Sequence, residues 1–522
     1  MTVQPRERGP AQDDRPRLIE LLAALSVATD LGMGQPAETA LRSCVLATGI
    51  ARAMELPDDD VRATCLSTLL RHIGCTATAA AEARLYGDEL ESRRAAQPAD
   101  FGDRREMLAL ALASSRGTGA QRPWRTARTI VGDLRHGRDI VLSVCDAASM
   151  LAARLRLGPS VEAALSQQFE RWDGTGPLGI AHDGVPLPAR IMDVATQAVL
   201  FAPDGYDAVQ EMVDARAGTW FDPGVADVFQ RAGRGLLSDL ESADPWRAIL
   251  DREPAPIAYI ADADLDRIAR CFADFADVKS PYTHGHSVEV ASLSESAGRM
   301  LGLPEDEVAA LRRAALLHDL GRVAISSAIW EKPGALTHSE WELVRLHPYH
   351  TERILAGSRA LDPLARTAGM HHERLDGSGY PHRLSADAIP LAARVLAAAD
   401  CFQAATQDRA HRTALTVDQA AELVVSEARA GRLDADCVAA VVEASGQRPP
   451  RYRRDWPAGL SDREVDVLRL VCRGLTNAQI AKQLVISRRT AEHHVQHIYA
   501  KIGRSTRAAA ILFALEHDLV SR

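Results

Sequence analysis

An internal repeat limits what this chain of 522 residues can fold into more than any single motif does. Glu170 to Gly176 reads ERWDGTG, and Glu373 to Gly379 reads ERLDGSG. Three further segment pairs keep the same order in both halves: MELPDDDV with LGLPEDEV, LLRHIGC with LLHDLGR, and VPLPARIMDVAT with IPLAARVLAAAD. Because segments that recur in a fixed order indicate one structural unit used twice, we predict two copies of one domain in tandem.

The repeated segments carry a helical pattern. In PEDEVAALRRAALLHDLGR, Val308, Leu311 and Ala315 share one face, acidic residues fill the first turn, and Gly321 offers a stop. No run alternates apolar and polar residues for long enough to make a convincing strand. The sequence therefore predicts an all-α fold.

The two copies differ at their polar positions. The second copy has His286, His318, Asp319, His371, His372 and Asp400, where the first has, in the same order, Thr39, Arg71, His72, Gln168, Phe169 and Thr196. Scaffold residues repeat while potential metal ligands do not. We expect the first copy to be structural or regulatory and not catalytic.

The second copy is a candidate metal centre. Its potential ligands are His286, His318, Asp319, His347, His371, His372 and Asp400. Imidazole and carboxylate groups suit iron, manganese, nickel or zinc. Seven ligands are too many for one ion and fit two divalent ions, which at about 3.5–4 Å apart polarise a phosphoryl group for attack. A lone histidine is more often solvated or hydrogen-bonded than metal-bound, so the hypothesis rests on the whole ordered set.

Residues 281 to about 440 resemble the HD-GYP family of metal phosphohydrolases. The resemblance is carried by GHSVEVA, HDLGR, EKPGALT, His347-Pro348, HHERLDGSGYP and AADCFQA. It implies a helical HD-type fold for both copies, the first degenerate, and hydrolysis of cyclic di-GMP to pGpG or GMP at two or three metals. His286, His318, Asp319 and Asp400 would hold one metal, and Asp319 would bridge to a second held by His347, His371 and His372.

The same resemblance assigns substrate contacts. It places the loop of Gly379, Tyr380 and Pro381 at the substrate pocket, and Arg409 and Arg412 on the substrate phosphates.

Three positions depart from the family pattern. Arg322 replaces the usual lysine of the His-Asp motif; together with Asp319 it is the expected catalytic pair, able to neutralise phosphate charge but not to donate a proton. Tyr282 stands where members with three metals have a glutamate, which favours two metals, and Gln403 replaces a frequent acid.

A second kind of unit follows residue 458. Ser461 with Glu464, and Thr476 with Gln479, have capping-box spacing, and Ser487 is a plausible N-cap. Basic residues crowd this segment as phosphate contacts require, although a basic helical face is often merely solvated. Short helices joined by tight turns indicate a helix-turn-helix.

This segment resembles the LuxR/NarL-type DNA-binding domain, a four-helix unit, in REVDVLRLVCRGLTNAQIA and ISRRTAEHHVQHIYAKIG. The resemblance implies that a helix over about 488–502 enters the major groove of double-stranded DNA and that the chain acts as a homodimer on paired half-sites. The expected DNA contacts are Arg488, Arg489, Thr490, Glu492, His493, Gln496 and Lys501. Glu492 replaces a common lysine, so base preference should differ.

Length and composition complete the expected organisation. We predict a disordered tail (1–17), a degenerate HD-type domain (18–235), a helical connector (236–280), an HD-GYP domain (281–444), a linker (445–458) and a helix-turn-helix domain (459–522). The net charge of −9 confines any nucleic-acid contact to a local surface. Eight scattered cysteines, a charged start and no long apolar run favour a cytoplasmic protein without a membrane contact.

The expected function is a transcriptional regulator that carries a metal-dependent cyclic di-GMP phosphodiesterase. Two alternatives stay open: a non-catalytic nucleotide sensor that controls DNA binding, and a phosphohydrolase of another nucleotide or phosphoester. Metal content with product analysis separates the first from the second, and a substrate panel identifies the third.

Overall fold

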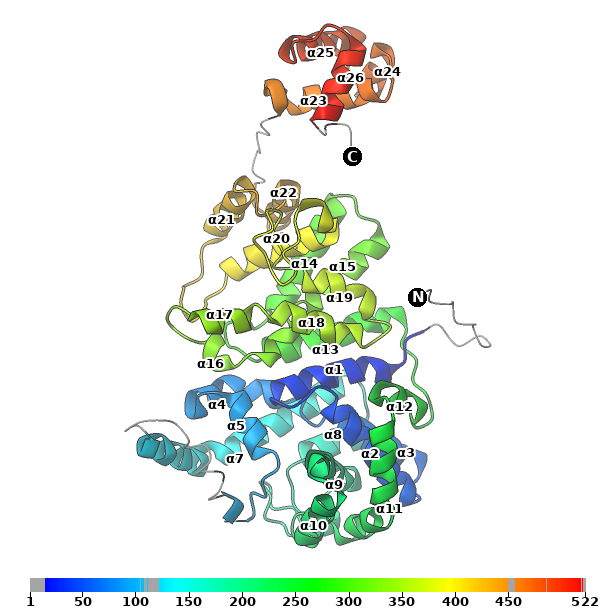
Figure 1. Ribbon diagram of the computed structural model, residues 1–522, viewed down its shortest axis with the longest axis vertical. Coiled ribbons are helices and arrows are strands. Elements are labelled where there is room, and N and C mark those ends of the chain that lie inside the picture. Colours follow the sequence, from blue (N-terminus) through cyan, green and yellow to red (C-terminus); the bar gives the residue numbers. More distant parts are fainter. Residues whose placement is uncertain are drawn as a thin grey trace. The chain divides into compact units, whose positions relative to one another are not determined.

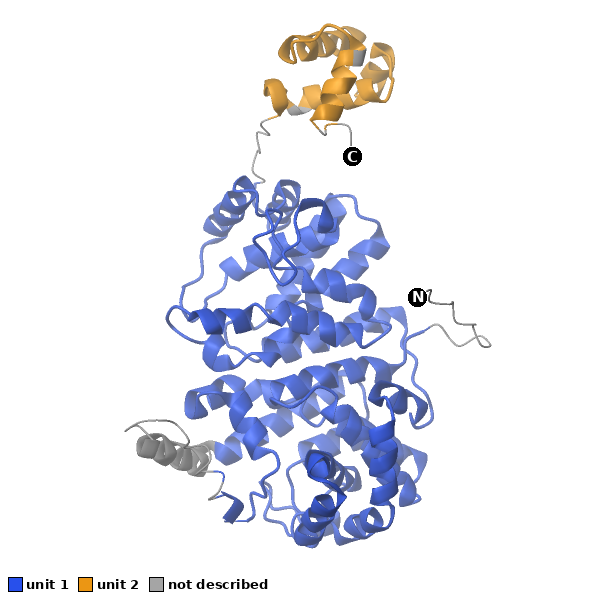
Figure 2. Cartoon of the chain, viewed as in Figure 1, with its two compact units in different colours: residues 1–449 blue, residues 450–522 orange. Residues whose placement is uncertain are grey.

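The computed structural model describes residues 15–103, 105–107, 110, 122–448, 456–484, 486–517 and 519. The chain divides into two compact units, residues 1–449 and 450–522 (Figure 2). The all-α prediction is confirmed, because the only β structure among the described residues is four isolated bridges. None of the described helices is both long enough and apolar enough to cross a membrane.

The first unit contains two successive sets of helices (Figure 1). The first set is α1 (Leu18–Gly32), α2 (Thr39–Ala53), α3 (Asp58–Leu69), η1 (Cys75–Thr78), α4 (Ala79–Tyr86), α5 (Glu89–Ala96), α7 (Arg122–Arg154), α8 (Pro159–Ser166), η2 (His182–Gly184), α9 (Leu187–Phe201), η3 (Ala202–Asp204), α10 (Tyr206–Arg216), α11 (Pro223–Ser242) and α12 (Pro245–Asp251).

The second set follows residue 261. It is α13 (Asp262–Asp277), α14 (His286–Met300), α15 (Glu305–Leu317), η4 (Leu320–Ala324), α16 (Ser327–Trp330), α17 (His338–Val344), α18 (His347–Ala356), α19 (Asp362–Gly369), η5 (Ala386–Ala388), α20 (Leu391–Ala405), α21 (Val417–Arg429) and α22 (Ala435–Ala444). We call residues 15–251 the first half and 262–448 the second half of this unit.

Corresponding helices of the two halves pack alike. In the first half α2 packs on both α3 and α9, and in the second half α14 packs on both α15 and α20. Helices α3 and α15 each follow a proline and begin with three acidic residues, which favour a helix N-terminus. On α15 the predicted face is correct, since Val308, Leu311 and Ala315 are buried.

One glycine acts differently from its prediction. Helix α15 ends at Leu317, and Gly321 lies beyond it within η4. A methyl group at Gly321 would come within 2.1 Å of the His347 carbonyl oxygen on α18. Gly74, at the matching place in LLRHIGC, would likewise bring a methyl group within 2.0 Å of the Val144 carbonyl oxygen on α7. Both glycines therefore permit a close helix approach.

The repeated ERxDG loops share their hydrogen bonds as well as their letters. The carboxylate of Glu373 accepts from the backbone N–H groups of His382 (2.7 Å) and Leu384 (2.8 Å). The carboxylate of Glu170 accepts from those of Leu178 (2.7 Å) and Ile180 (2.9 Å). Each glutamate thus closes a loop of the same form.

The two halves meet along α1 and α4. Helix α1 packs on η4 and α18, and α4 packs on α16, as the adjacent ribbons in Figure 1 indicate. The predicted boundary at residue 236 falls within α11. The predicted tail lies mostly outside the described residues, but Arg17 is described and its Nε donates to Glu253 at 2.6 Å.

The second unit is a small helical domain with its own core. Its elements are η6 (Pro457–Gly459), α23 (Asp462–Cys472), α24 (Asn477–Gln483), α25 (Arg488–Lys501) and α26 (Arg507–Glu516). Both predicted capping boxes are present, and the Ser487 hydroxyl accepts from the Thr490 N–H at 3.0 Å. Val467, Leu468 and Ile480 are fully buried in its core. Much of the predicted linker, residues 449–455, lies outside the described residues.

Candidate metal centre and helix-turn-helix surface

The second half brings all seven predicted metal ligands together from five elements. His286 begins α14, His318 and Asp319 follow α15, His347 begins α18, His371 and His372 follow α19, and Asp400 lies in α20. All are buried except His372, which is partly exposed. Residues far apart in sequence therefore converge on one enclosed centre.

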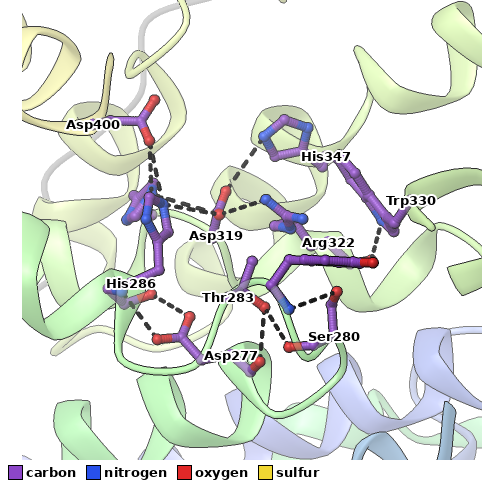
Figure 3. A network of polar contacts seen from close by, with 12 residues as sticks. Asp277, Ser280, Thr283, His286, Asp319, Arg322, Trp330, His347 and Asp400 are labelled. Carbon is purple, nitrogen blue, oxygen red and sulfur yellow. Dashed lines mark hydrogen bonds and ion pairs between the residues drawn. The ribbon is translucent and has the colours of Figure 1, made fainter. Parts of the chain in front are cut away.

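Asp319 lies at the middle of this centre (Figure 3). Its Oδ2 atom is 3.6 Å from Nε2 of His286 and 3.7 Å from Nε2 of His318. Its Oδ1 atom is 3.4 Å from Nε2 of His347 and 3.6 Å from Nε2 of His371. The two oxygens of one carboxylate thus face two different pairs of imidazoles.

Asp400 faces the same centre from α20. Its Oδ1 atom is 3.3 Å from Nε2 of His286 and 3.7 Å from Nε2 of His318, and its Oδ2 atom is 3.9 Å from Nδ1 of His372. Two groups of potential ligands result, one of His286, His318 and Asp400 and the other of His347, His371 and His372. Asp319 lies between them.

Hydrogen bonds on the outer side orient four of the histidines. The Nδ1 atoms of His318, His347 and His371 donate to the carbonyls of Ala315 (2.7 Å), Val344 (2.6 Å) and Ala368 (2.7 Å), and Nδ1 of His286 donates to the side-chain oxygen of Gln403. Each bond leaves the Nε2 atom directed at the centre, as metal-binding histidines require. Nε2 of His318 is buried without a hydrogen-bond partner.

The ionisation of most of these groups also fits a cation. Burial lowers the pKa of His371 to about 3 and that of His347 to about 4, so both imidazoles are neutral at pH 7. Burial acts to raise the pKa of Asp319, but His318 and Arg322 outweigh it and hold that pKa well below its usual range. Burial acts to lower the pKa of His318, but Asp319 and Asp400 outweigh it and raise that pKa to about 9, so this imidazole must release a proton to bind a metal. Neutral imidazole and ionised carboxylate are the metal-binding forms. The residues present therefore fit a centre of two or more divalent ions.

Arg322 lies beside this centre. Its Nη1 atom is 3.1 Å from Oδ2 of Asp319, and its guanidinium carbon is 3.9 Å from the centroid of the Trp330 ring (Figure 3). Trp330 was not predicted from the sequence. Trp330 lies eight residues after Arg322, and that spacing alone does not indicate a contact between the two side chains.

The loop of Gly379, Tyr380 and Pro381 borders the centre. The Tyr380 ring lies 4.8 Å from the His372 ring, centroid to centroid, and its backbone N–H donates to the His372 carbonyl at 3.2 Å. A methyl group at Gly379 would come within 2.4 Å of the Arg374 nitrogen, so the tight turn requires glycine there. The loop is thereby held against the ligand histidines.

The two predicted phosphate contacts have different surroundings. Burial, with the charge of Arg322 adding to it, lowers the pKa of Arg409 to about 10. The guanidinium of Arg412 instead donates to the carbonyls of Ala404 (2.8 Å) and Ala405 (2.9 Å) at the end of α20. The guanidinium of Arg412 is therefore engaged in ending a helix.

Gln403 connects the ligand His286 to Glu289 by hydrogen bonds. It accepts from His286 through its side-chain oxygen, and its Nε2 donates to Oε2 of Glu289 at 2.7 Å. The substitution that departs from the family pattern thus still orients a ligand.

The matching positions of the first half are filled differently. Nη2 of Arg71 is 2.7 Å from Oδ1 of Asp193, and both side chains are buried. Gln168 is fully buried as well. Among the described residues of this half, no three histidine, cysteine or acidic side chains form a potential metal site.

The second unit exposes most of its predicted contact residues along α25. Arg488, Arg489, Thr490, His493 and Gln496 are exposed, and Glu492 is half-buried and paired with Arg488 at 3.0 Å. Lys501 differs, because its Nζ is 2.6 Å from Oε2 of Glu464, the capping-box acid of α23. Lys501 therefore ties two helices of the domain together.

Comparison with known proteins matches both units. A family model described as an HD domain matches residues 270–437, and one described as bacterial regulatory proteins of the luxR family matches residues 458–514.

Two curated relatives place the first match more finely. The chain is 33% identical over 453 residues to 3′3′-cGAMP-specific phosphodiesterase 3 of Vibrio cholerae. The aligned region covers 83% of this chain and 96% of that protein. It is 41% identical over 169 residues to the cyclic di-GMP phosphodiesterase response regulator RpfG of Xanthomonas campestris, covering 31% of this chain and 44% of that one.

A solved structure agrees with the first of these relatives. The crystal structure of a cyclic GMP-AMP specific phosphodiesterase of V. cholerae, V-cGAP3, covers 84% of this chain and 100% of its own, with 27% identity and a TM-score of 0.57. The similarity therefore extends well beyond the HD match into the first half.

Proposed function

The chain belongs to the HD-GYP phosphodiesterase family and ends in a LuxR-family helix-turn-helix domain, and on this basis we propose that it hydrolyses a 3′3′-linked cyclic dinucleotide and binds double-stranded DNA. The observation that carries the hydrolase proposal is the position of Asp319, whose two oxygens each face a pair of inward-directed imidazole nitrogens. We place 3′3′-cGAMP ahead of cyclic di-GMP, because the relative that aligns over most of both chains is named for 3′3′-cGAMP.

In this proposal the ligands divide as the sequence suggested. His286, His318, Asp319 and Asp400 would hold one divalent ion of iron, manganese, nickel or zinc, and His347, His371 and His372 with Asp319 would hold a second. The metals would supply the Lewis acidity that phosphodiester hydrolysis needs. Water adds to phosphorus while the bond to the 3′ oxygen breaks and that oxygen takes a proton, which leaves a linear dinucleotide with a 5′-phosphate.

The other residues act on the substrate. Arg322 and Arg409 offer positive charge to its phosphates near the centre, and Arg322 stays protonated, so it stabilises charge without moving a proton. Tyr380, held between Gly379 and Pro381, borders the ligand histidines and offers an aromatic face to a base. Arg412 contributes by fixing the end of α20, which carries Asp400.

We propose that the first half is a degenerate HD-type copy. Shared helix packing, the two crowded glycines and the two matching glutamate loops support this. The domain boundaries given by the sequence remain our proposal, except that the boundary predicted at residue 236 moves to the end of α11.

We also propose that α25 enters the major groove and that two copies of the chain bind paired half-sites. Arg488, Arg489, Thr490, His493 and Gln496 are exposed and form the contact face, with Glu492 beside them.

The test is a comparison of three proteins purified without oxygen: wild type, the double variant His371→Ala/His372→Ala, and the matched control Gln168→Ala/Phe169→Ala. Bound metal is counted, and products from 3′3′-cGAMP and cyclic di-GMP are separated by chromatography. We expect turnover and two bound metals per chain in the wild type and in the control. In the histidine variant we expect no turnover and fewer than two bound metals. Metal without product from either nucleotide would refute the substrate assignment, and equal activity in all three proteins would refute the site.

A further inference from the structure

Glu89 of the first half is fully buried against the second half. It begins α5, and none of its surface is exposed. Its Oε1 atom accepts from Nζ of Lys279 at 2.8 Å and from the backbone N–H of Ser327 at 2.7 Å, and its Oε2 accepts from the hydroxyl of Ser326 at 2.7 Å. A buried carboxylate requires such partners, and here all three come from the other half of the unit.

One of these contacts caps a short helix of the second half. Ser327 is the first residue of α16, so its N–H has no acceptor within that helix. Glu89 supplies the acceptor, and the hydroxyl of Ser326, which Glu89 also holds, accepts from the next N–H, that of Ala328, at 3.2 Å. The start of α16 is therefore fixed by a side chain from the first half.

The other end of α16 supports Arg322. Trp330 ends the helix, its ring lies 3.9 Å from the guanidinium carbon of Arg322, and its Nε1 donates to the Arg322 carbonyl at 3.4 Å. Figure 3 shows Arg322 between Trp330 and Asp319. A movement of α16 would move the indole on which the guanidinium rests, and so change its approach to Asp319.

Lys279 links Glu89 to a second wall of the centre. Lys279 is buried and lies two residues after Asp277. Asp277 accepts from the N–H (2.9 Å) and the hydroxyl (2.7 Å) of Ser287, the residue that follows His286. The Glu89–Lys279 pair thus lies beside the segment that positions the first metal ligand.

We infer that Glu89 is a positioning residue for the reaction: through α16 and Trp330 it sets the place of the Arg322 guanidinium, so the first half completes the active site of the second. This inference rests on the proposed hydrolase function. It gives the first half a role that requires no ligand of its own.

The test removes the pair without leaving a buried charge. In Glu89→Leu/Lys279→Met both charges are replaced by apolar groups, an exchange that buried ion pairs often tolerate. We compare it with Trp330→Leu, with the triple variant, and with a control, Arg154→Gln, which removes an exposed ion pair to Asp274 that also joins the two halves.

We expect kcat to fall about 10- to 100-fold in Glu89→Leu/Lys279→Met and in Trp330→Leu, with metal content unchanged and the control unaffected. In the triple variant kcat should fall no further than in either parent, because both act through the same guanidinium. Unchanged kcat in Glu89→Leu/Lys279→Met, or losses that multiply in the triple variant, would overturn the inference.

Amide hydrogen exchange gives a readout that does not depend on turnover. In Glu89→Leu/Lys279→Met the amides of α16 should exchange faster than in the wild type, while those of α20 should not change. If the wild type hydrolyses neither nucleotide but α16 loses protection, the proposed function fails and the physical link stands. Unchanged protection of α16 would refute the proposed link between Glu89 and α16.

Discussion

His72 of the first half allows a measurement of what has replaced the metal centre there. His72 stands where the second copy has Asp319, but it is buried beside the two guanidinium groups of Arg71 and Arg93. Its Nε2 accepts from the side-chain amide of Gln97 at 3.0 Å. Burial, with both arginines adding to it, lowers the pKa of His72 from 6.5 to about 3.

The sign and size of the effect follow from that shift. Between pH 3 and 6.5 the unfolded chain binds a proton at His72 that the folded chain does not, so stability falls as the pH drops through this range. At pH 5 the loss relative to neutral pH is about 2 kcal/mol from this residue alone. Other buried histidines add similar losses, so the contribution of His72 must be obtained as a difference.

The assay is denaturant unfolding of the wild type and His72→Gln at pH 5, 6, 7 and 8. Glutamine does not titrate, so the stability difference between the two proteins should be constant from pH 7 to 8 and should shift by about 2 kcal/mol in favour of the variant at pH 5. A difference that stays constant down to pH 5 would mean that His72 is protonated in the folded protein and would refute the reasoning.

Three further outcomes are expected. Asp319→Asn should lower bound metal below two ions per chain and cut turnover at least about 100-fold, because one carboxylate faces both ligand groups. Metal analysis and product chromatography check this, and a full metal content would contradict it. Gly321→Ala should destabilise the first unit by about 1–3 kcal/mol or more, measured by thermal unfolding, since its methyl group would meet the His347 carbonyl at 2.1 Å. Arg489→Ala should weaken DNA binding and make its salt dependence shallower by about one unit of slope, whereas Lys501→Ala should lower the melting temperature of the second unit, because Lys501 is paired with Glu464. Salt titrations by fluorescence anisotropy separate the last two variants, and identical behaviour would contradict the assignment.

The features that could be predicted from the sequence depend on the spacing of residues that are close together in the chain. Helical periodicity gave the fold class, capping boxes gave the helix starts at Ser461 and Thr476, and the ordered histidines gave a ligand set that does converge. Each of these signals lies within a few residues of chain, or repeats between the two halves.

The features that escaped prediction depend on contacts between distant segments. Glu89 lies 190 residues from Lys279 and 238 from Ser327, and nothing in its neighbourhood marks it as part of the centre. The family resemblance assigned Arg412 to the substrate phosphates, and in the structure its guanidinium donates to two carbonyls at the end of α20. An arginine suits a phosphate and a helix C-terminus equally well, so the sequence could not separate the two uses.

The buried pair of Arg71 and Asp193 places a cation in the first half where the second half has the potential ligand His318. A guanidinium is a cation attached to the chain and does not lose its charge at physiological pH. Under the proposed function, chelation would therefore remove positive charge from the second half while the first half keeps its own.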